Sequence, residues 1–233
     1  MRIAEKIITP IVDTVFPRLC VGCGEADQTI CPKCFDQITL MLKQRCVRCE
    51  KLSSLGRTCP KCREHSELDN LLAFAYYEGP IKEAMHQYKY EGRVDALNSF
   101  KQIINQNQTV IKDLNSLIKP DSIIVPVPLY RQRLWWRGFN QSDLIARIFA
   151  DQFGLPILSN RLFRTVYTIP QMKLQRRGRL HNLEGVFECL EMQNQTVFLI
   201  DDIATTGSTL SACAAALKHA GAKKVVGVTV ARV

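Results

Sequence analysis

Beyond residue 67, short apolar runs alternate with amphipathic stretches along the chain. The apolar runs predict strands at 71–77, 123–128, 156–158, 197–200 and 225–230. The amphipathic stretches between them predict helices at 81–88, 94–117, 142–153 and 211–218. Strands that alternate with helices are typical of a parallel sheet covered on both faces. We therefore expect an α/β fold with a parallel sheet over residues 67–233.

The apolar run 197–200 ends at two adjacent acids, Asp201 and Asp202, and a small polar loop follows. A loop between the carboxyl end of a strand and the start of a helix offers unpaired N–H groups and the positive end of the helix dipole, which together favour a phosphate. A glycine lets the backbone approach the ligand closely. The residues that we expect to bind the phosphate are Ala204, Thr205, Thr206, Gly207, Ser208 and Thr209.

The paired acids indicate what the phosphate is attached to. Ionised carboxylates only accept hydrogen bonds, so Asp201 and Asp202 suit the two hydroxyls of a ribose, with Mg²⁺ as an additional ligand. The alternative is an ordinary strand, turn and helix with a polar cap. The unbroken order of strand, paired acids, polar loop and alanine-rich helix favours the ribose-phosphate site. No Gly-x-x-x-x-Gly-Lys motif is present, which argues against an ATPase.

Eight of the ten cysteines form four C-x-x-C pairs between residues 20 and 62. The pairs are Cys20/Cys23, Cys31/Cys34, Cys46/Cys49 and Cys59/Cys62. Two such pairs place four thiolates around one tetrahedral zinc ion, so the eight predict two structural Zn²⁺ sites without an open position for a catalytic water. Disulfides are the alternative, but the chain shows no signal peptide. Sequential grouping and a cross-brace both fit the spacing, and we favour sequential grouping because each half then closes a short loop.

Three regions follow from these patterns. Residues 1–19 predict a short helical segment, residues 20–66 a zinc-finger module, and residues 67–233 the α/β domain. The module has too few apolar residues for a core, so the metal would supply its folding energy, about 10–16 kcal/mol for a structural zinc. Cys189 and Cys213 are expected in the core. Without a secretory signal or an apolar run of about 18 uncharged residues, we expect a cytoplasmic protein with no transmembrane segment.

The net charge of +9 is concentrated in the middle of the chain, where residues 121–185 carry 10 Lys and Arg against 4 Asp and Glu. Two segments hold most of this charge. The first contains Arg131, Arg133, Trp135, Trp136 and Arg137. Arginines interleaved with aromatic rings are typical of single-stranded nucleic-acid binding, where each stacked base contributes about 1–3 kcal/mol. The alternative, in which one Trp is a core residue and the arginines bind only the pyrophosphate of a small ligand, stays open.

The second basic segment, 164–182, has little apolar periodicity. It contains Lys173, Arg176, Arg177 and Arg179. We expect a loop that closes over an anionic ligand, with Arg177 on the phosphates and the other three residues on nucleic acid. A basic loop without a ligand is the alternative.

The acid-and-loop stretch resembles the ribose-phosphate loop of the type I phosphoribosyltransferases, which bind phosphoribosyl pyrophosphate (PRPP). The resemblance then widens to the whole chain. The C-x-x-C pairs, Tyr88-Lys89-Tyr90-Glu91-Gly92-Arg93, Val125-Pro126-Val127-Pro128, Arg137-Gly138-Phe139-Asn140-Gln141-Ser142 and the 201–209 loop occur in an order similar to that of the ComF family. This resemblance implies a zinc finger joined to a type I phosphoribosyltransferase-like domain.

The resemblance also implies a function. It points to a cytoplasmic competence protein that handles incoming single-stranded DNA in natural transformation, with PRPP or ribose phosphate as a ligand and other competence or DNA-uptake proteins as partners. Purine-salvage phosphoribosyltransferases place an Asp as general base two residues before the loop glycine, where this chain has Thr205. We therefore favour ligand binding. A Mg²⁺-dependent phosphoribosyltransferase with an unknown acceptor is the alternative, and a zinc-stabilised adaptor for other competence proteins is a third hypothesis.

Overall fold

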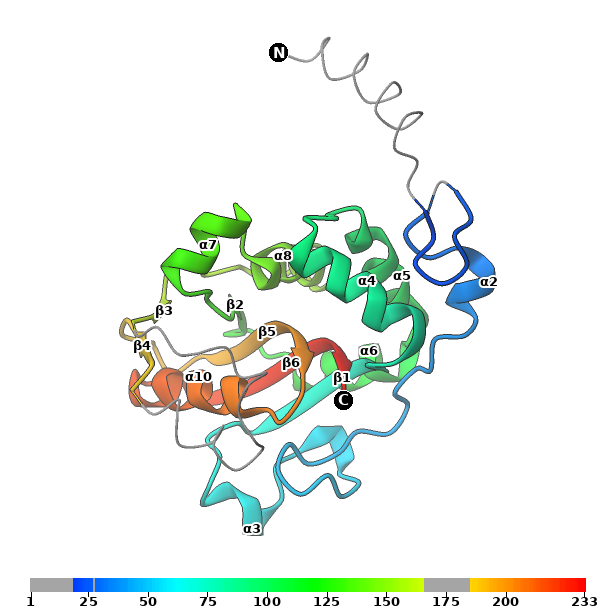
Figure 1. Ribbon diagram of the computed structural model, residues 1–233. Coiled ribbons are helices and arrows are strands. Elements are labelled where there is room, and N and C mark those ends of the chain that lie inside the picture. The colour runs from blue at the N-terminus through cyan, green and yellow to red at the C-terminus, as the bar shows by residue number, and fades with distance from the viewer. Residues whose placement is uncertain (1–18, 27, 166–184) are drawn as a thin grey trace.

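The computed structural model describes residues 19–26, 28–165 and 185–233. Its centre is a four-stranded sheet in which every strand is parallel to its neighbours, in the order β1-β6-β5-β2 (Figure 1). The strands are β1 (Asn70–Tyr76), β2 (Ile123–Pro126), β5 (Thr196–Ala204) and β6 (Lys224–Arg232). The predicted α/β fold with a parallel sheet is confirmed.

Helices cover both faces of this sheet, because alternate side chains along each strand point to opposite sides. One face, which includes Phe74 and Phe198, packs against four helices. These are α4 (Gly79–Tyr90), α5 (Ala96–Gln106), α6 (Gln108–Leu117) and α8 (Gln141–Phe153). The other face, which includes Leu71 and Leu199, packs against α10 (Ser208–His219) and a small antiparallel hairpin of β3 (Leu162–Arg164) and β4 (Phe187–Cys189). Figure 1 shows α10 on the opposite side of the sheet from α4 and α8.

Several predicted elements differ from those observed. The single helix expected at 94–117 is two helices, α5 and α6, because the Asn107 side chain ends one and begins the next: it accepts from the N–H of Val110 at 3.2 Å and donates to the carbonyl of Phe74 at 2.8 Å. The strand expected at 156–158 is a single bridge between Ile157 and Ile124. The β3–β4 hairpin was not predicted.

The Cys-rich stretch is joined to the sheet through the free edge of β1. Leu40 pairs with Ala75 in antiparallel fashion, and the N–H of Met41 donates to the carbonyl of Phe74 at 2.9 Å. The Gln44 side chain bonds both the N–H and the carbonyl of Ala73 at 3.0 Å. The remaining short helices are α2 (Pro32–Phe35), η1 (Ser54–Gly56), α3 (Pro60–Arg63) and α7 (Arg131–Arg137). No helix in the described part of the chain is long and apolar enough to cross a bilayer.

Candidate functional site

Strand β5 runs past the two acids instead of ending before them. Asp201 is opposite Thr229 of β6, and Ala204 is opposite Arg232. The expected loop is therefore shorter, residues 205–207, and the helix begins at Ser208 rather than at 211. The backbone that carries the two acids is paired with β6 in the sheet, which fixes it more firmly than a loop would.

The short loop places hydroxyls at the start of α10. Gly207 has φ +70° and caps the helix, a conformation that favours glycine. The hydroxyl oxygens of Thr206 and Ser208 lie 2.9 Å apart, and Thr205 is exposed. Residues 204–209 therefore bring together a helix N-terminus and side-chain hydroxyls, as the phosphate prediction requires.

The two acids have different partners. Asp201 accepts hydrogen bonds on the same oxygen from the Ser142 hydroxyl at 2.9 Å and from the N–H of Asp202 at 2.9 Å. Asp202 is 6% exposed and pairs with the ammonium of Lys89 across 2.9 Å. Lys89 belongs to the last turn of α4, which runs two residues beyond its predicted end. Sequence reasoning missed Lys89 as a site residue, although it lies within the motif that carried the family resemblance.

Ser142 reaches Asp201 because of the way in which α8 begins. Asn140 caps the helix: its side-chain oxygen accepts from the N–H of Ser142 at 3.2 Å, and its amide donates to the carbonyl of Val127 at 3.1 Å. The cap thus ties the start of α8 to the end of β2, the strand next to β5. Ser142, which was predicted only as the first residue of a helix, therefore supplies a hydrogen-bond donor to the site.

The site holds its charges in a buried setting. Burial raises the pKa of Asp201 to about 7, the charge of Asp202 adds to the shift, and Lys89 and the Ser142 hydrogen bond oppose it. Burial acts to lower the pKa of Lys89, but the adjacent Asp202 outweighs this and the pKa is raised. Lys89 therefore stays charged at neutral pH. Asp201, with a pKa of about 7, is partly protonated at that pH, and its protonated form can donate a hydrogen bond as well as accept one.

Arg137 borders this site and is partly buried. Its guanidinium lies over the Tyr90 ring, 5.1 Å from the centroid, and its Nε is buried without a hydrogen-bond partner. Burial lowers the pKa of Arg137. Because Tyr90 follows Lys89 in α4, the contact joins α7 to the helix that supplies Lys89.

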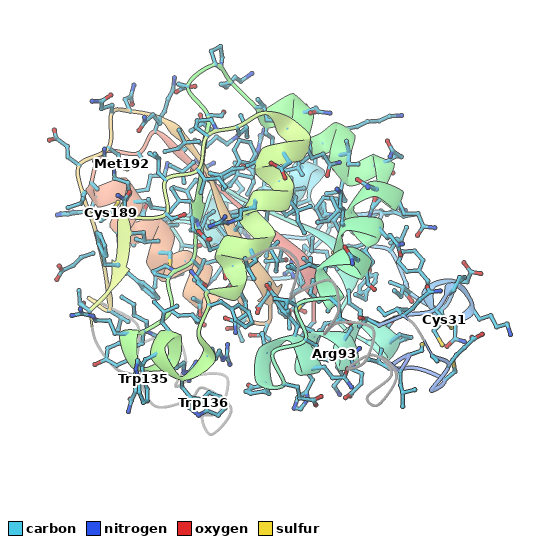
Figure 2. The ribbon with its side chains drawn as sticks, turned by 90° about the horizontal axis from the view of Figure 1, so that it is seen from above. Cys31, Arg93, Trp135, Trp136, Cys189 and Met192 are labelled. Carbon is cyan, nitrogen blue, oxygen red and sulfur yellow. The ribbon has the colours of Figure 1, made fainter. Side chains whose placement is uncertain are left out.

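The remainder of α7 is exposed. Trp135 is 86% exposed and Trp136 67%, so neither of the two tryptophans is a core residue. Arg131 is exposed and Arg133 partly exposed on the same seven-residue helix. Figure 2 shows both tryptophans at the margin of the molecule, away from the packed interior. The part of the alternative that placed one tryptophan in the core is therefore wrong, and the part that assigns the arginines to a pyrophosphate stays a prediction.

Lys173, Arg176, Arg177 and Arg179 lie outside the residues that the structure describes. Their roles stay predictions. Of the two cysteines expected in the core, Cys213 is buried and Cys189 is only partly buried.

The eight paired cysteines form two groups in sequential order, as favoured from the sequence. In each group, all four sulfurs lie within 4.8 Å of one another. The groups are Cys20, Cys23, Cys31, Cys34 and Cys46, Cys49, Cys59, Cys62. No disulfide joins the cysteines of the described chain.

The sulfur geometry fits zinc. Zinc–sulfur bonds of about 2.3 Å in a tetrahedron require sulfurs about 3.8 Å apart. The Cys23 and Cys31 sulfurs lie 3.5 Å apart, and those of Cys49 and Cys59 lie 3.7 Å apart. The second pair of each group starts a short helix with proline at its first position, which aims both sulfurs inward. The two groups are structural zinc sites, with no ligand position left for water.

Comparison with known proteins agrees with this geometry. The model of the double zinc ribbon domain matches residues 11–64. The chain is 31% identical to the DNA utilization protein YhgH of Escherichia coli K12 over 211 residues, which are 89% of this chain and 87% of that protein. It is 27% identical to competence protein F of Haemophilus influenzae over 206 residues, 86% and 89% of the two chains.

A third relative comes from another organism. Competence protein ComFC of Bacillus subtilis is 26% identical over 206 residues, which are 84% of this chain and 80% of that protein. All three matches run through both the zinc ribbons and the α/β domain, since neither region alone is that long. On its sequence, its paired zinc sites and its parallel sheet, the chain belongs to the ComF family of competence and DNA-utilization proteins.

Proposed function

We propose that this protein handles single-stranded DNA in DNA uptake or utilization in the cytoplasm, and that its α/β domain binds PRPP or a ribose phosphate. One observation carries the ligand part of the proposal. The paired acids at the end of β5 lie beside a hydroxyl-bearing loop at the N-terminus of α10. Acceptors for sugar hydroxyls therefore adjoin donors for a phosphate.

The charges around the acids support a phosphorylated sugar in preference to a neutral one. Lys89 is paired with Asp202, and Arg137 borders the site with a buried Nε that lacks a protein partner. A phosphate or pyrophosphate would supply acceptors for these cations. Mg²⁺, as the usual companion of PRPP, would be held by the oxygens of Asp201 or Asp202.

The DNA part of the proposal rests on α7 and on the relatives. Two exposed tryptophans beside Arg131 and Arg133 offer flat faces for bases and charge for phosphates. The names of the relatives refer to competence and to DNA utilization. Single-stranded DNA bound to α7 would lie next to Arg137, and thus close to the proposed ribose-phosphate site.

A phosphoribosyltransferase with an unknown acceptor is a second candidate, and one observation favours it. Asp201, whose pKa burial raises to about 7, can exchange a proton near neutral pH, as a general base must. Asp201 is not at the position of the purine-salvage base, and Thr205, which is, cannot accept a proton at neutral pH. For this reason binding without transfer is the function that we favour.

The ligand proposal is tested by calorimetry with PRPP and with ribose 5-phosphate, each with and without Mg²⁺. Asp202→Asn should weaken binding by at least about tenfold, because it removes a charged acceptor. The matched control is Asp121→Asn, an exposed acid just before β2 and therefore at the opposite end of the sheet. Wild-type protein that binds neither ligand at millimolar concentration would refute the site.

The DNA proposal is tested on the same variants with a fluorescent single-stranded oligonucleotide. Affinity should fall as salt rises, because phosphate contacts release counterions. If Asp202→Asn weakens DNA and PRPP alike, the two ligands share the acids. If it weakens PRPP alone, the DNA lies on α7. No binding at low salt would refute the DNA part.

A further inference from the structure

The second zinc ribbon, which contains Cys46, Cys49, Cys59 and Cys62, lies directly against the loop 205–207, called here the phosphate loop. Val47, the residue after Cys46, is 3% exposed, and its Cγ2 lies 2.2 Å from the position that a Cβ on Gly207 would occupy. A side chain at 207 is thus excluded twice, by this contact and by the positive φ. The zinc-held turn 46–49 forms one wall of the loop.

Two further contacts tie this ribbon to the same part of the sheet. Arg232, at the end of β6, is 3% exposed and donates to the carbonyls of Arg45 at 2.9 Å and Cys46 at 3.0 Å. In the sheet, Arg232 is opposite Ala204, the last residue of β5, and the next N–H along the chain, that of Val233, donates to the Ala204 carbonyl at 3.0 Å. One buried arginine therefore holds the backbone on both sides of the contact.

The exit from the second ribbon contacts the helix that follows the loop. The hydroxyls of Ser66 and Ser211 lie 2.9 Å apart. Ser211 lies in the first turn of α10, and its N–H bonds the Gly207 carbonyl at 2.8 Å. The ribbon and its exit thus contact β6, the strand next to β5, together with the loop itself and the helix after it.

The first ribbon repeats the pattern but lies elsewhere. Cys20-Val21-Gly22-Cys23 matches Cys46-Val47-Arg48-Cys49 in spacing and in its valine. Its described contacts are with α4 and with the turn before α5: a Cβ on Gly22 would lie 3.6 Å from Pro80, and Thr29 donates to Asp95 at 2.6 Å. The chain therefore supplies its own control, an equivalent turn on a different part of the domain.

We infer that the second zinc site positions the phosphate loop, so that zinc at Cys46, Cys49, Cys59 and Cys62 sets the affinity for a phosphorylated ribose. A ribbon of this size has no core of its own and loses its shape without metal. Without zinc, Val47 would lose its contact with Gly207, and the loop would lose the packing that holds it on this side. The coupling free energy between two binding sites is the same in both directions, so the bound ligand should strengthen zinc binding at the second site. Zinc binding at the first site should not change. The ligand named here rests on the proposed function.

The first test compares Val47→Ala with Val21→Ala, both loaded with two zinc ions per chain as measured by metal analysis. Amide hydrogen exchange of the peptide that spans 204–209 should quicken in Val47→Ala and stay unchanged in Val21→Ala. Calorimetry should show PRPP affinity reduced by at least about fivefold in Val47→Ala, the lower end for coupled sites. Unchanged exchange in Val47→Ala overturns the inference.

The second test uses the wild-type chain, so it does not depend on a variant that folds. Zinc loss to a coloured chelator should occur in two phases, and PRPP should slow one of them at least about fivefold. Cys23→Ser, which removes a ligand of the first site, should leave the PRPP-sensitive phase. Equal slowing of both phases, or of neither when PRPP binds, overturns the inference. If PRPP does not bind at all, the proposed function fails, and the exchange of 204–209 alone decides the coupling.

Discussion

Lys89 and Asp202 form the ion pair on which the charge balance of the site depends. The ammonium and the carboxylate oxygen are 2.9 Å apart, and their side chains are 22% and 9% exposed. An acid this buried needs its partner, because an unpaired charge would lose its hydration without compensation. A ligand phosphate would compete with Asp202 for Lys89, while ribose hydroxyls would satisfy the acid in return.

Lys89→Met should lower the free energy of unfolding by about 3 kcal/mol, because it leaves Asp202 buried and unpaired. Urea denaturation measures the change. The double variant Lys89→Met/Asp202→Asn should recover part of the loss, since it removes the stranded charge. Strictly additive losses in the double variant would show that the two residues do not interact.

Asp201 should make stability depend on pH between about 4 and 7. Burial raises its pKa to about 7, so the folded state holds this proton where an unfolded chain, with an Asp pKa of about 3.9, has released it. The stabilising contribution is complete below pH 4 and is lost as pH rises through 7. Asp201→Asn should gain on wild type by up to about 1.4 kcal/mol per pH unit across this window.

The measurement is urea denaturation of both proteins from pH 4 to pH 8, with Asp121→Asn as the control that follows wild type. Ligand affinity should move in the opposite sense, since the ionised acid accepts sugar hydroxyls better: PRPP binding should strengthen as pH rises through 7. A difference between Asp201→Asn and wild type that does not change with pH would contradict the assignment.

At the scale of elements, α7 is a short helix that leaves its aromatic rings in solvent. It has no buried residue, and it ends at Gly138 with φ +77°. Burial cannot explain two tryptophans on such a helix, because exposed rings contribute little to folding. Arg137 connects it to α4 through the contact with the Tyr90 ring.

Trp135→Ala and Trp136→Ala should each weaken single-stranded DNA binding by about 1–3 kcal/mol, the value of one stacked base. Leu134→Ala, an exposed residue of the same helix without a ring, is the matched control. Because these are the two tryptophans of the chain, wild-type fluorescence should also be quenched as DNA binds. Unchanged affinity in both Trp variants would move the DNA site away from α7.

The elements of the sheet were predictable because their signal is local. Apolar runs identified β1, β2, β5 and β6 to within a few residues. The extent of β5 was not predictable, since Asp201 and Asp202 break the apolar pattern while their backbone stays in the ladder with β6. Asn107 likewise divides a helix because its side chain caps α6 at Val110 and because its amide protons bind the carbonyls of Met41 and Phe74, which are distant in the sequence.

At the scale of the molecule, the Cys-rich stretch passes from one face of the sheet to the other around the edge of β1. Cys20, Cys31 and Cys34 join the core beneath α4 and α5, whereas Val47 joins the core beneath α10. The pairing of Leu40 with Ala75 lies between them. Figure 1 shows this path, from α2 beside α5 to α3 on the other side of β1.

Removal of both zinc ions should therefore destabilise the whole chain. Thermal denaturation followed by circular dichroism should show a single transition whose midpoint falls by at least about 10 °C with chelator, a few kcal/mol at the usual conversion for this size. Added Zn²⁺ should restore it. A chelator-insensitive main transition would show that the α/β domain is stable without its ribbons.

Local patterns were enough to predict the alternation of strands and helices, the eight zinc ligands and the loop with its paired acids, because each is a pattern of neighbours in the chain. The contacts of Lys89 with Asp202, Ser142 with Asp201 and Val47 with Gly207 arise from folding. These pairs come from separate elements. Parallel pairing of β5 with β2 and β6 helps to bring them together at the carboxyl ends of the strands. Contacts across such distances depend on register and packing, which no local pattern encodes.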